Sequence, residues 1–198
     1  GGLFKPKSRT RAVSDVSFEV LPGETLGLVG ESGCGKSTLS RALMRLIEPD
    51  AGIITLAGQD ITTLDETGLR RARGKVQMVF QDPFASLNPR MTVRDLITEP
   101  AYLHKGIGPK ERAALAEDLL AKVALESAAA ERYPHQFSGG QRQRLCIARA
   151  LSVAPKLIVA DEAVSALDVS TAARVTRLMQ DLQDSLGVSF LFISHDIA

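Results

Sequence analysis

Residues 25–38 read TLGLVGESGCGKST, and this stretch decides the fold. Thr25–Val29 is a short apolar run of the kind that forms a buried strand. The pattern GxxxxGKS follows it at residues 30–37, and Ser37–Ile47 then carries apolar residues at helical spacing. A strand, a glycine-rich loop and a helix in this order are the context that a phosphate-binding loop needs. The sequence therefore predicts an α/β core built around a phosphate site.

The residue types of this loop suit a nucleoside triphosphate. Glycines let backbone N–H groups close around phosphate oxygens, and the helix N-terminus adds partial positive charge. We expect Lys36 to reach the β- and γ-phosphates, Ser37 to bind Mg²⁺ and Thr38 to help at the α-phosphate. A glycine turn without a ligand is the alternative. The expected nucleotide contacts are Gly30, Glu31, Ser32, Gly33, Cys34, Gly35, Lys36, Ser37 and Thr38.

Two adjacent acids follow a second apolar run, Leu157–Ala160. In open α/β sheets, ligands bind at the carboxyl ends of the strands. We therefore expect Asp161 to hold Mg²⁺, directly or through water, and Glu162 to polarise the attacking water. Solvated surface acids are the alternative, but the strand before them is too apolar for that interpretation.

Two further polar residues also come directly after predicted strands. His195 follows the apolar run Val188–Ile193, with Ser194 between them. Gln81 comes directly after the predicted strand Val76–Phe80. We expect His195 to contact the γ-phosphate and orient the water; a polar end-cap is the alternative. Gln81 is expected to coordinate Mg²⁺ or water and to sense the γ-phosphate.

A second glycine-rich segment precedes the predicted helix Gly139–Leu151. Ser138, Gly139, Gly140 and Gln141 would form an anion site at that helix N-terminus. One domain needs only one such site per nucleotide, so the spare site implies a second domain that supplies the other nucleotide. An ordinary Ser N-cap with helix-entry glycines is the alternative.

The remaining pattern predicts the domain organisation. Val13–Val20 alternates apolar and polar residues like a strand, Gly52–Ala57 reads as another strand, and Val169–Leu186 as a helix. Between Asp82 and about Gln136 prolines recur, and Lys110–Leu125 is an amphipathic helix. We expect one domain, with an α/β core of residues 1–81 and 149–198 and an inserted α-helical subdomain of residues 82–148. Continuous apolar strands that alternate with helices favour a parallel sheet covered on both faces.

Composition limits the classes of function. The 198 residues are 44% apolar, enough to bury a sizeable core, and the net charge of +1 gives no bulk electrostatic case for nucleic acid. No apolar run of about 18 residues and no signal-like N-terminus is present, so we expect neither a membrane span nor export. Cys34 and Cys146 are in no metal-ligand spacing, which fits a reduced cytosolic location. The chain starts at Gly1 and stops three residues past His195, so we expect a C-terminally truncated fragment.

With these motifs the chain resembles the ATP-binding subunit of ABC transporters along essentially its whole length, a P-loop NTPase with a parallel-sheet core, N-terminal antiparallel strands and an inserted α-helical subdomain. In the family's terms the motifs are Walker A at 30–37, the Q-loop at Gln81, the signature at Phe137–Gln141, Walker B at Leu157–Asp161 with Glu162, the D-loop at Ser165–Asp168 and the switch histidine His195. Phe137 and Ala163 depart from the superfamily's frequent Leu and Pro. Residues 79–90, 132–144 and 158–170 are similar to peptide and glutathione importers.

The resemblance implies ATP and Mg²⁺ as cofactors and a composite site. Each ATP would contact Walker A of one domain and the signature of the other, with Asp168 of the D-loop nearby. The implied partners are a second ABC ATPase subunit, identical or related, permease subunits in the membrane and, indirectly, a substrate-binding protein. The location would be the cytoplasmic face of the membrane, as a peripheral subunit. The adenine-stacking residue is not evident, with Phe4, Phe18 and Arg11 as candidates.

Two other classes remain as alternatives. A soluble ABC ATPase that acts on nucleic acid or ribosomes is one, but only residues 82–136 separate Gln81 from the signature, without sustained heptads. Near-zero net charge also argues against a nucleic-acid clamp. A non-hydrolysing regulatory module is the other, and the presence of both Glu162 and His195 argues against it.

Overall fold

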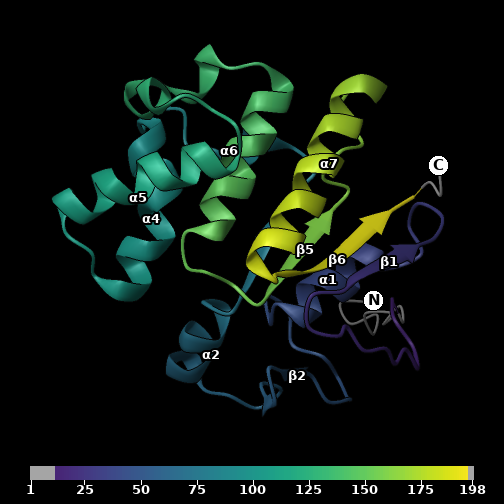
Figure 1. The fold of residues 1–198 in the computed structure, drawn as a ribbon. Coiled ribbons are helices and arrows are strands. Elements are labelled where there is room, and N and C mark those ends of the chain that lie inside the picture. The colour runs from purple at the N-terminus through teal and green to yellow at the C-terminus, as the bar shows by residue number, and fades with distance from the viewer. Residues whose placement is uncertain (1–11, 196–198) are drawn as a thin grey trace, which may run out of the picture.

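The computed structural model describes residues 12–195, and a four-stranded parallel sheet lies at its centre (Figure 1). The strand order is β1 (Thr25–Val29), β6 (Ser189–Ser194), β5 (Leu157–Asp161) and β4 (Val76–Val79). Each neighbouring pair is parallel. The expected parallel sheet is confirmed, and the predicted strand at residues 25–29 matches to the residue.

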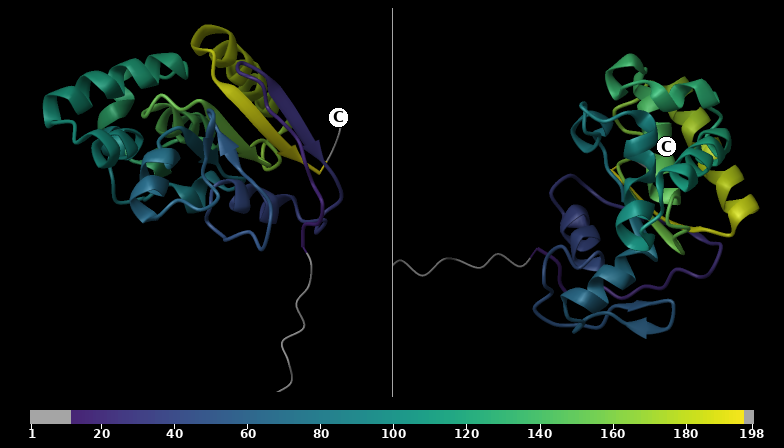
Figure 2. Two further views of the ribbon diagram at one scale, coloured as in Figure 1. Left: turned by 90° about the horizontal axis from the view of Figure 1, so that it is seen from below. Right: turned by 90° about the vertical axis from the view of Figure 1, so that its left-hand side faces the viewer.

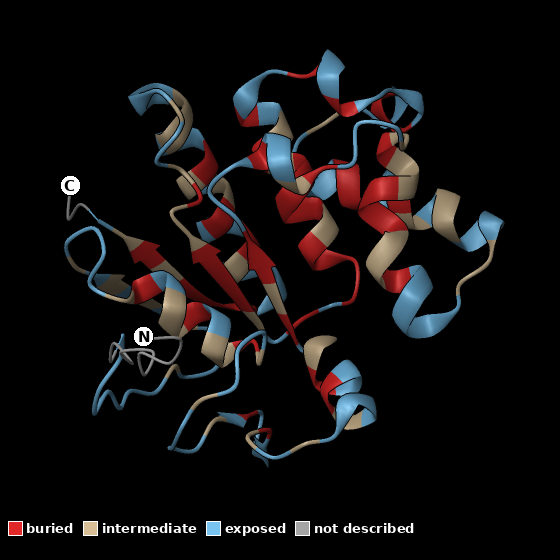
Figure 3. Cartoon of the chain, turned by 180° about the vertical axis from the view of Figure 1, so that it is seen from behind, coloured by how far each residue is buried: buried red, intermediate tan, exposed pale blue. Residues whose placement is uncertain are grey.

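Alternate residues of the strands face two different apolar clusters. On β5, Ile158 and Ala160 belong to the cluster that contains α6 (Gly139–Leu151) and α7 (Val169–Leu186). Val159 belongs to the other cluster, with residues at the end of α1 (Lys36–Leu43) and with α2 (Glu66–Arg73). This period of two is what a strand buried on both faces requires. Figure 3 shows the buried residues along the central strands and on the helices around them.

Helices of the middle of the chain pack on α6. They are α3 (Pro83–Ser86), α4 (Val93–Lys105) and α5 (Pro109–Lys122), followed by short 3₁₀ turns at Ser127–Glu131 and Pro134–Gln136. Their apolar side chains form one cluster with those of α6, including Leu96, Ile97, Leu119, Leu120 and Leu145. Figures 1 and 2 show α4, α5 and α6 gathered at one side of the molecule, with β1 and α1 on the other.

Several predicted elements differ in the structure. Residues 13–20 lie within the described part of the chain but form no strand: almost all are exposed, and no neighbouring strand offers them a ladder partner. Within the predicted strand at 52–57 only β2 (Thr55–Leu56) is paired, antiparallel to β3 (Gln59–Asp60). The β2–β3 pair is therefore the antiparallel part of this fold, and the prediction for 13–20 was wrong.

The first helix is shorter than its pattern predicts. It ends at Leu43, Arg45 has a positive φ of 50°, and Leu46 is 53% exposed. Leu46 therefore does not continue the apolar face of the helix. Helices α2 and α4 were not predicted as such, because charged residues of α2 and the internal Pro100 of α4 mask their apolar spacing.

No helix among residues 12–195 combines the length and the apolar character that a membrane crossing requires.

Candidate nucleotide-binding site

The carboxyl ends of all four parallel strands lie at one edge of the sheet. The register pairs Val29 with Ser194, Ile193 with Asp161 and Ala160 with Val79. Each of these strands is followed by predicted site residues. The phosphate loop follows β1, His195 follows β6, Glu162 follows β5, and Gln81 follows β4 after Phe80. Four motifs that are far apart in sequence thus converge at one edge.

The phosphate loop has a backbone that only glycine adopts without strain. Gly33 and Gly35 have φ of 84° and 102°. A Cβ on Gly35 would lie 2.2 Å from the carbonyl oxygen of Ala12, and one on Gly30 would lie 2.8 Å from Cys34 Sγ. The loop is therefore a tight cradle of backbone N–H groups, which is what binding of phosphate oxygens requires. Gly35 is also the N-cap of α1, so the loop opens directly into the helix.

The Lys36 ammonium lies inside this loop. Lys36 is 7% exposed, and its Nζ donates to the carbonyl oxygens of Gly30 at 2.6 Å and Glu31 at 2.8 Å. A buried ammonium needs such partners, and Nζ also lies 3.8 Å from Cys34 Sγ. Ser37 and Cys34 are exposed at the loop surface. The loop therefore suits a phosphate group, because the positive charge of Lys36 that would compensate the phosphate already lies within it.

Asp161 is the group that best fits a metal ion. Its Oδ1 is buried without a hydrogen-bond partner. Burial, and then the neighbouring Glu162 carboxylate, raise the pKa of Asp161, against weaker opposing effects of Ser40, Arg41 and Lys36. An orphaned, desolvated carboxylate oxygen is what a cation would satisfy.

The rest of the candidate metal site is sparse in acids. Among residues 12–195 no cluster of three or more His, Cys, Asp or Glu side chains is arranged for a metal. That composition fits Mg²⁺, which proteins usually hold with one or two carboxylates while the nucleotide supplies phosphate oxygens. The residues present therefore fit Mg²⁺ bound together with a nucleotide, not a metal held by the protein alone.

Glu162 and His195 face each other across the ends of β5 and β6. The distance from His195 Nδ1 to Glu162 Oε2 is 3.6 Å, with the Glu162 side chain 19% exposed and the His195 side chain 50% exposed. Glu162 has a positive φ of 49°, an uncommon conformation for a residue with a side chain and one that tends to occur at functional sites. Its N–H donates to the Ile193 carbonyl at 2.9 Å, which joins the residue after β5 to strand β6.

Gln81 reaches this pair through a serine that sequence reasoning did not single out as a site residue. Gln81 Nε2 donates to Ser165 Oγ at 3.3 Å, and Ser165 Oγ donates to the Glu162 carbonyl at 2.9 Å. Ser40 was also missed, although it is fully buried and influences Asp161. A polar residue on the apolar stripe of α1 is the signal that could have found Ser40.

The signature residues lie elsewhere, at the start of α6. Ser138 Oγ accepts from Gln141 N at 3.3 Å, and Gln141 Oε1 accepts from Ser138 N at 3.0 Å. This reciprocal pair is a capping box, so the ordinary N-cap interpretation holds for the side chains in this structure. Ser138 and Gly139 are exposed, which leaves the helix N-terminus open to an anion from outside.

Asp168 is the N-cap of the next helix, α7. Its Oδ1 accepts from Ser170 Oγ at 2.7 Å and Thr171 N at 3.0 Å, and these hydrogen bonds lower the pKa of Asp168 to about 2. The two helix starts meet, since a Cβ on Gly140 would lie 2.3 Å from Thr171 Cγ2. The structure thus brings the start of α7, which Asp168 caps, close to the start of the signature helix α6. The candidate stacking residues Phe4 and Arg11 lie outside the described residues, and Phe18 is 40% exposed.

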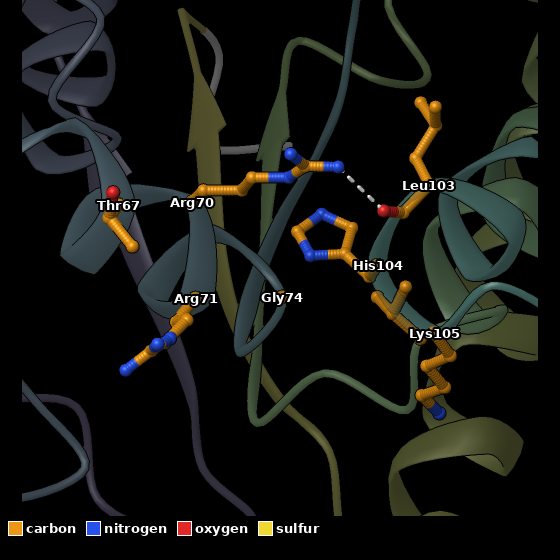
Figure 4. A pocket seen from close by; sticks show the side chains of 8 residues that line it. Thr67, Arg70, Arg71, Gly74, Leu103, His104 and Lys105 are labelled. Carbon is orange, nitrogen blue, oxygen red and sulfur yellow. Dashed lines mark hydrogen bonds between the residues drawn. The ribbon is translucent and has the colours of Figure 1, made fainter.

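A separate hollow of about 460 Å³ lies between α2 and the end of α4 (Figure 4). Arg70, Arg71 and Lys105 make its lining basic, and Arg70 Nη2 donates to the Leu103 carbonyl at 2.9 Å. Burial, followed by the charges of Arg70 and Lys105, lowers the pKa of His104. None of the predicted site residues lines this hollow.

A single known protein family accounts for most of these motifs. A family model described as "ABC transporter" matches residues 13–165. The matched range includes the phosphate loop, Gln81, the signature, and Asp161 and Glu162 at the end of β5.

Curated relatives match along the whole chain. The oligopeptide transport ATP-binding protein AppF of Bacillus subtilis (strain 168) is 55% identical over 199 residues, which cover 100% of this chain and 60% of AppF. The glutathione import ATP-binding protein GsiA of Escherichia coli (strain K12) is 53% identical over 198 residues, which cover 100% of this chain and 32% of GsiA. The chain therefore spans 60% or less of the length of these two relatives.

Solved structures confirm the fold. The dimeric structure of a post-hydrolysis state of the ATP-binding cassette MJ0796, bound to ADP and Pi, superposes with a TM-score of 0.82 at 32% identity, over 94% of this chain and 81% of that one. The structure of cbiO1 from Clostridium perfringens, part of the ABC transporter complex cbiONQ, gives a TM-score of 0.84 at 26% identity, over 94% and 72% of the two chains.

Proposed function

Because this chain belongs to the ABC transporter family, we propose that it binds and hydrolyses ATP to power the import of a solute through a membrane permease. The observation that carries the proposal is the convergence of the phosphate loop, Asp161, Glu162 and His195 at one edge of the sheet. A binding-only module would need the loop but not the facing acid and histidine.

Each residue then has a defined task. The loop N–H groups and Lys36 hold the phosphates. Ser37, Gln81 and Asp161 would hold Mg²⁺, which neutralises charge on the β- and γ-oxygens. Glu162 polarises the attacking water, and His195 contacts the γ-phosphate and orients that water. Catalysis by positioning and electrostatics, with little covalent chemistry from the protein, is the usual pattern in phosphoryl transfer.

The second half of each site comes from a partner. Helix α6 begins at the signature residues Ser138, Gly139, Gly140 and Gln141, and Asp168 is the N-cap of α7. An exposed helix N-terminus that its own nucleotide does not use suits the nucleotide of a second ATPase subunit, identical or related. The dimeric cassette MJ0796 supports this arrangement.

The transported solute is a peptide or glutathione in this proposal. Support comes from AppF and GsiA, whose names give oligopeptide transport and glutathione import. The remaining partners are permease subunits and, indirectly, a substrate-binding protein, and the place is the cytoplasmic face of the membrane. These relatives do not favour the alternative of an ATPase that acts on nucleic acid.

Replacing the candidate base tests the ATPase. In the full-length subunit assembled with its permease, Glu162→Gln is expected to lower kcat for ATP about 100-fold or more, because water activation is lost. ATP binding, measured with a fluorescent ATP analogue, should stay within about threefold, since Lys36 and the loop are intact. Glu117→Gln, on the exposed face of α5, is the matched control. Near-normal hydrolysis by Glu162→Gln would count against the assignment.

A further inference from the structure

One face of α6 holds the short helix that follows Gln81. Arg142, Cys146 and Arg149 are spaced by four and three residues, so they share that face. Helix α3 lies against them, and it starts two residues after Gln81. Helix α6, which begins with the signature, therefore also packs against the segment that begins at Gln81.

Arg142 contacts both segments at once. Its Nε donates to the carbonyl oxygens of Pro134 at 3.1 Å and Phe137 at 2.8 Å, the residues that lead into Ser138. Its guanidinium carbon lies 3.7 Å from the centre of the Phe84 ring on α3. Phe84 is 65% exposed, so the stacking on Arg142 is its main anchorage and not a consequence of burial in the core.

Ser86 anchors the other end of α3. Arg149 Nη1 donates to the Ser86 carbonyl at 2.5 Å, and Ser86 Oγ lies 3.3 Å from Cys146 Sγ. Cys146 is 1% exposed, so this contact is enclosed. The two anchorages, at Phe84 and at Ser86, leave α3 little freedom to move without α6.

Gln81 connects the same segment to the candidate base. Its amide donates to Ser165 Oγ, which in turn donates to the Glu162 carbonyl. A continuous set of contacts therefore runs from the end of β5 through Gln81 and α3 to the residues just before Ser138. Coupling between sites is carried by contiguous packed and hydrogen-bonded groups of this kind.

Resting on the ATPase function proposed above, we propose that Arg142 is a positioning residue that ties the Gln81 segment to the signature. Movement of Gln81 with the γ-phosphate of one nucleotide is passed through α3 and Arg142 to Ser138, which serves the nucleotide of the partner subunit. Arginine suits this task because its planar group donates to carbonyls in its plane while its face stacks on a ring. Lysine keeps the charge but lacks that geometry.

Kinetics of the assembled full-length transporter test the role. Arg142→Lys is expected to lower kcat for ATP about tenfold while KM changes by less than about twofold, because nucleotide binding at the loop is untouched. Phe84→Leu, at an exposed position, should lower kcat in the same direction, and the double variant should be no worse than Arg142→Lys alone. Arg144→Gln is the matched control on the same helix, since its Nη1 donates to the Val123 and Ala124 carbonyls and not to α3.

Three outcomes of the kinetics would overturn the proposal. They are an unchanged kcat in Arg142→Lys, a loss equal to that of Arg144→Gln, and a rise in KM with kcat intact. If the wild-type transporter itself does not hydrolyse ATP, the proposed function fails, and the next measurement decides the inference separately.

A thiol trap reports the contact without hydrolysis. Ser86→Cys places a thiol beside Cys146, and mild oxidation should link the two, as peptide mass analysis would show. If α3 and α6 move together, the same yield is expected with and without ATP in the full-length protein. A link that forms in only one of these conditions, or in neither, overturns the proposal.

Discussion

The surroundings of the Asp161 carboxyl disfavour its charged form. Burial and Glu162 raise its pKa, so folding disfavours its ionised form. The folded state therefore binds the proton more tightly than the unfolded state, and the free energy of unfolding falls as pH rises through that raised pKa. At neutral pH the carboxylate is a net cost unless a cation offsets it.

Asp161→Asn is accordingly expected to raise the melting temperature at neutral pH without Mg²⁺ and nucleotide, and to lower ATP hydrolysis. The amide keeps the shape and removes the desolvated charge. Thermal unfolding of both proteins at successively lower pH checks the sign, because the difference in melting temperature should narrow as the wild-type carboxyl becomes protonated. A lower melting temperature for Asp161→Asn at neutral pH would contradict this account.

The pKa of Asp168 is shifted in the opposite direction from that of Asp161. Hydrogen bonds from Ser170 and Thr171 lower its pKa from 3.8 to about 2, so its contribution to stability is complete above pH 3.8 and is lost as pH falls through about 2. Asp168→Ala should lower the melting temperature by about 2–4 °C at neutral pH, through loss of the N-cap of α7.

The difference in melting temperature between wild type and Asp168→Ala should shrink as the pH is lowered from 3.8 towards about 2. Asp184→Ala is the control, since Asp184 lies near the other end of the same helix and caps nothing there. A difference that does not depend on pH would mean that the charge of Asp168 plays no part.

Helices α6 and α7 approach each other closely at their N-termini. A Cβ on Gly140 would lie 2.3 Å from Thr171 Cγ2. Threonine is stiff about χ1, and Thr171 Oγ1 also accepts from Arg174 Nη2 at 3.1 Å, so the methyl group cannot turn away freely. Gly140→Ala is expected to destabilise the fold by about 1–3 kcal/mol, although alanine favours helices over glycine.

Removal of the methyl group should rescue that loss. Thr171→Ser keeps the hydroxyl but lacks Cγ2, so Gly140→Ala combined with Thr171→Ser should recover most of the stability in urea unfolding. Strictly additive effects of the two substitutions would show that the loss has another cause.

The elements that the sequence predicted well are a short apolar strand and two helices with clear start signals. β1 and α7 match their predicted bounds, and α6 starts and ends as expected. Val13–Val20 also alternates apolar and polar residues, yet it forms no strand. Alternation gives a segment one apolar and one polar face, but a strand also needs a partner strand to pair with. The early end of α1 could not be predicted, since Leu46 fits the helical stripe but stays exposed.

Considered as a whole molecule, the chain assembles most of the predicted site from distant segments. The parallel sheet explains why the predicted phosphate loop, Glu162 and His195 all follow strand ends at one edge. Sequence spacing could not reveal that Gln81 bonds to Ser165, or that Asp168 lies with Gly140 at the helix starts. Both are contacts between segments that are distant in the sequence, which no local pattern encodes.

The measurement that tests the central claim most directly is ATP hydrolysis by the full-length subunit reconstituted with its permease. The rate is compared without a binding protein and with the cognate binding protein loaded with a dipeptide, a longer peptide or glutathione. The account predicts basal hydrolysis and selective stimulation by one of these three ligands. Hydrolysis that no loaded binding protein changes would contradict the assignment to peptide or glutathione import.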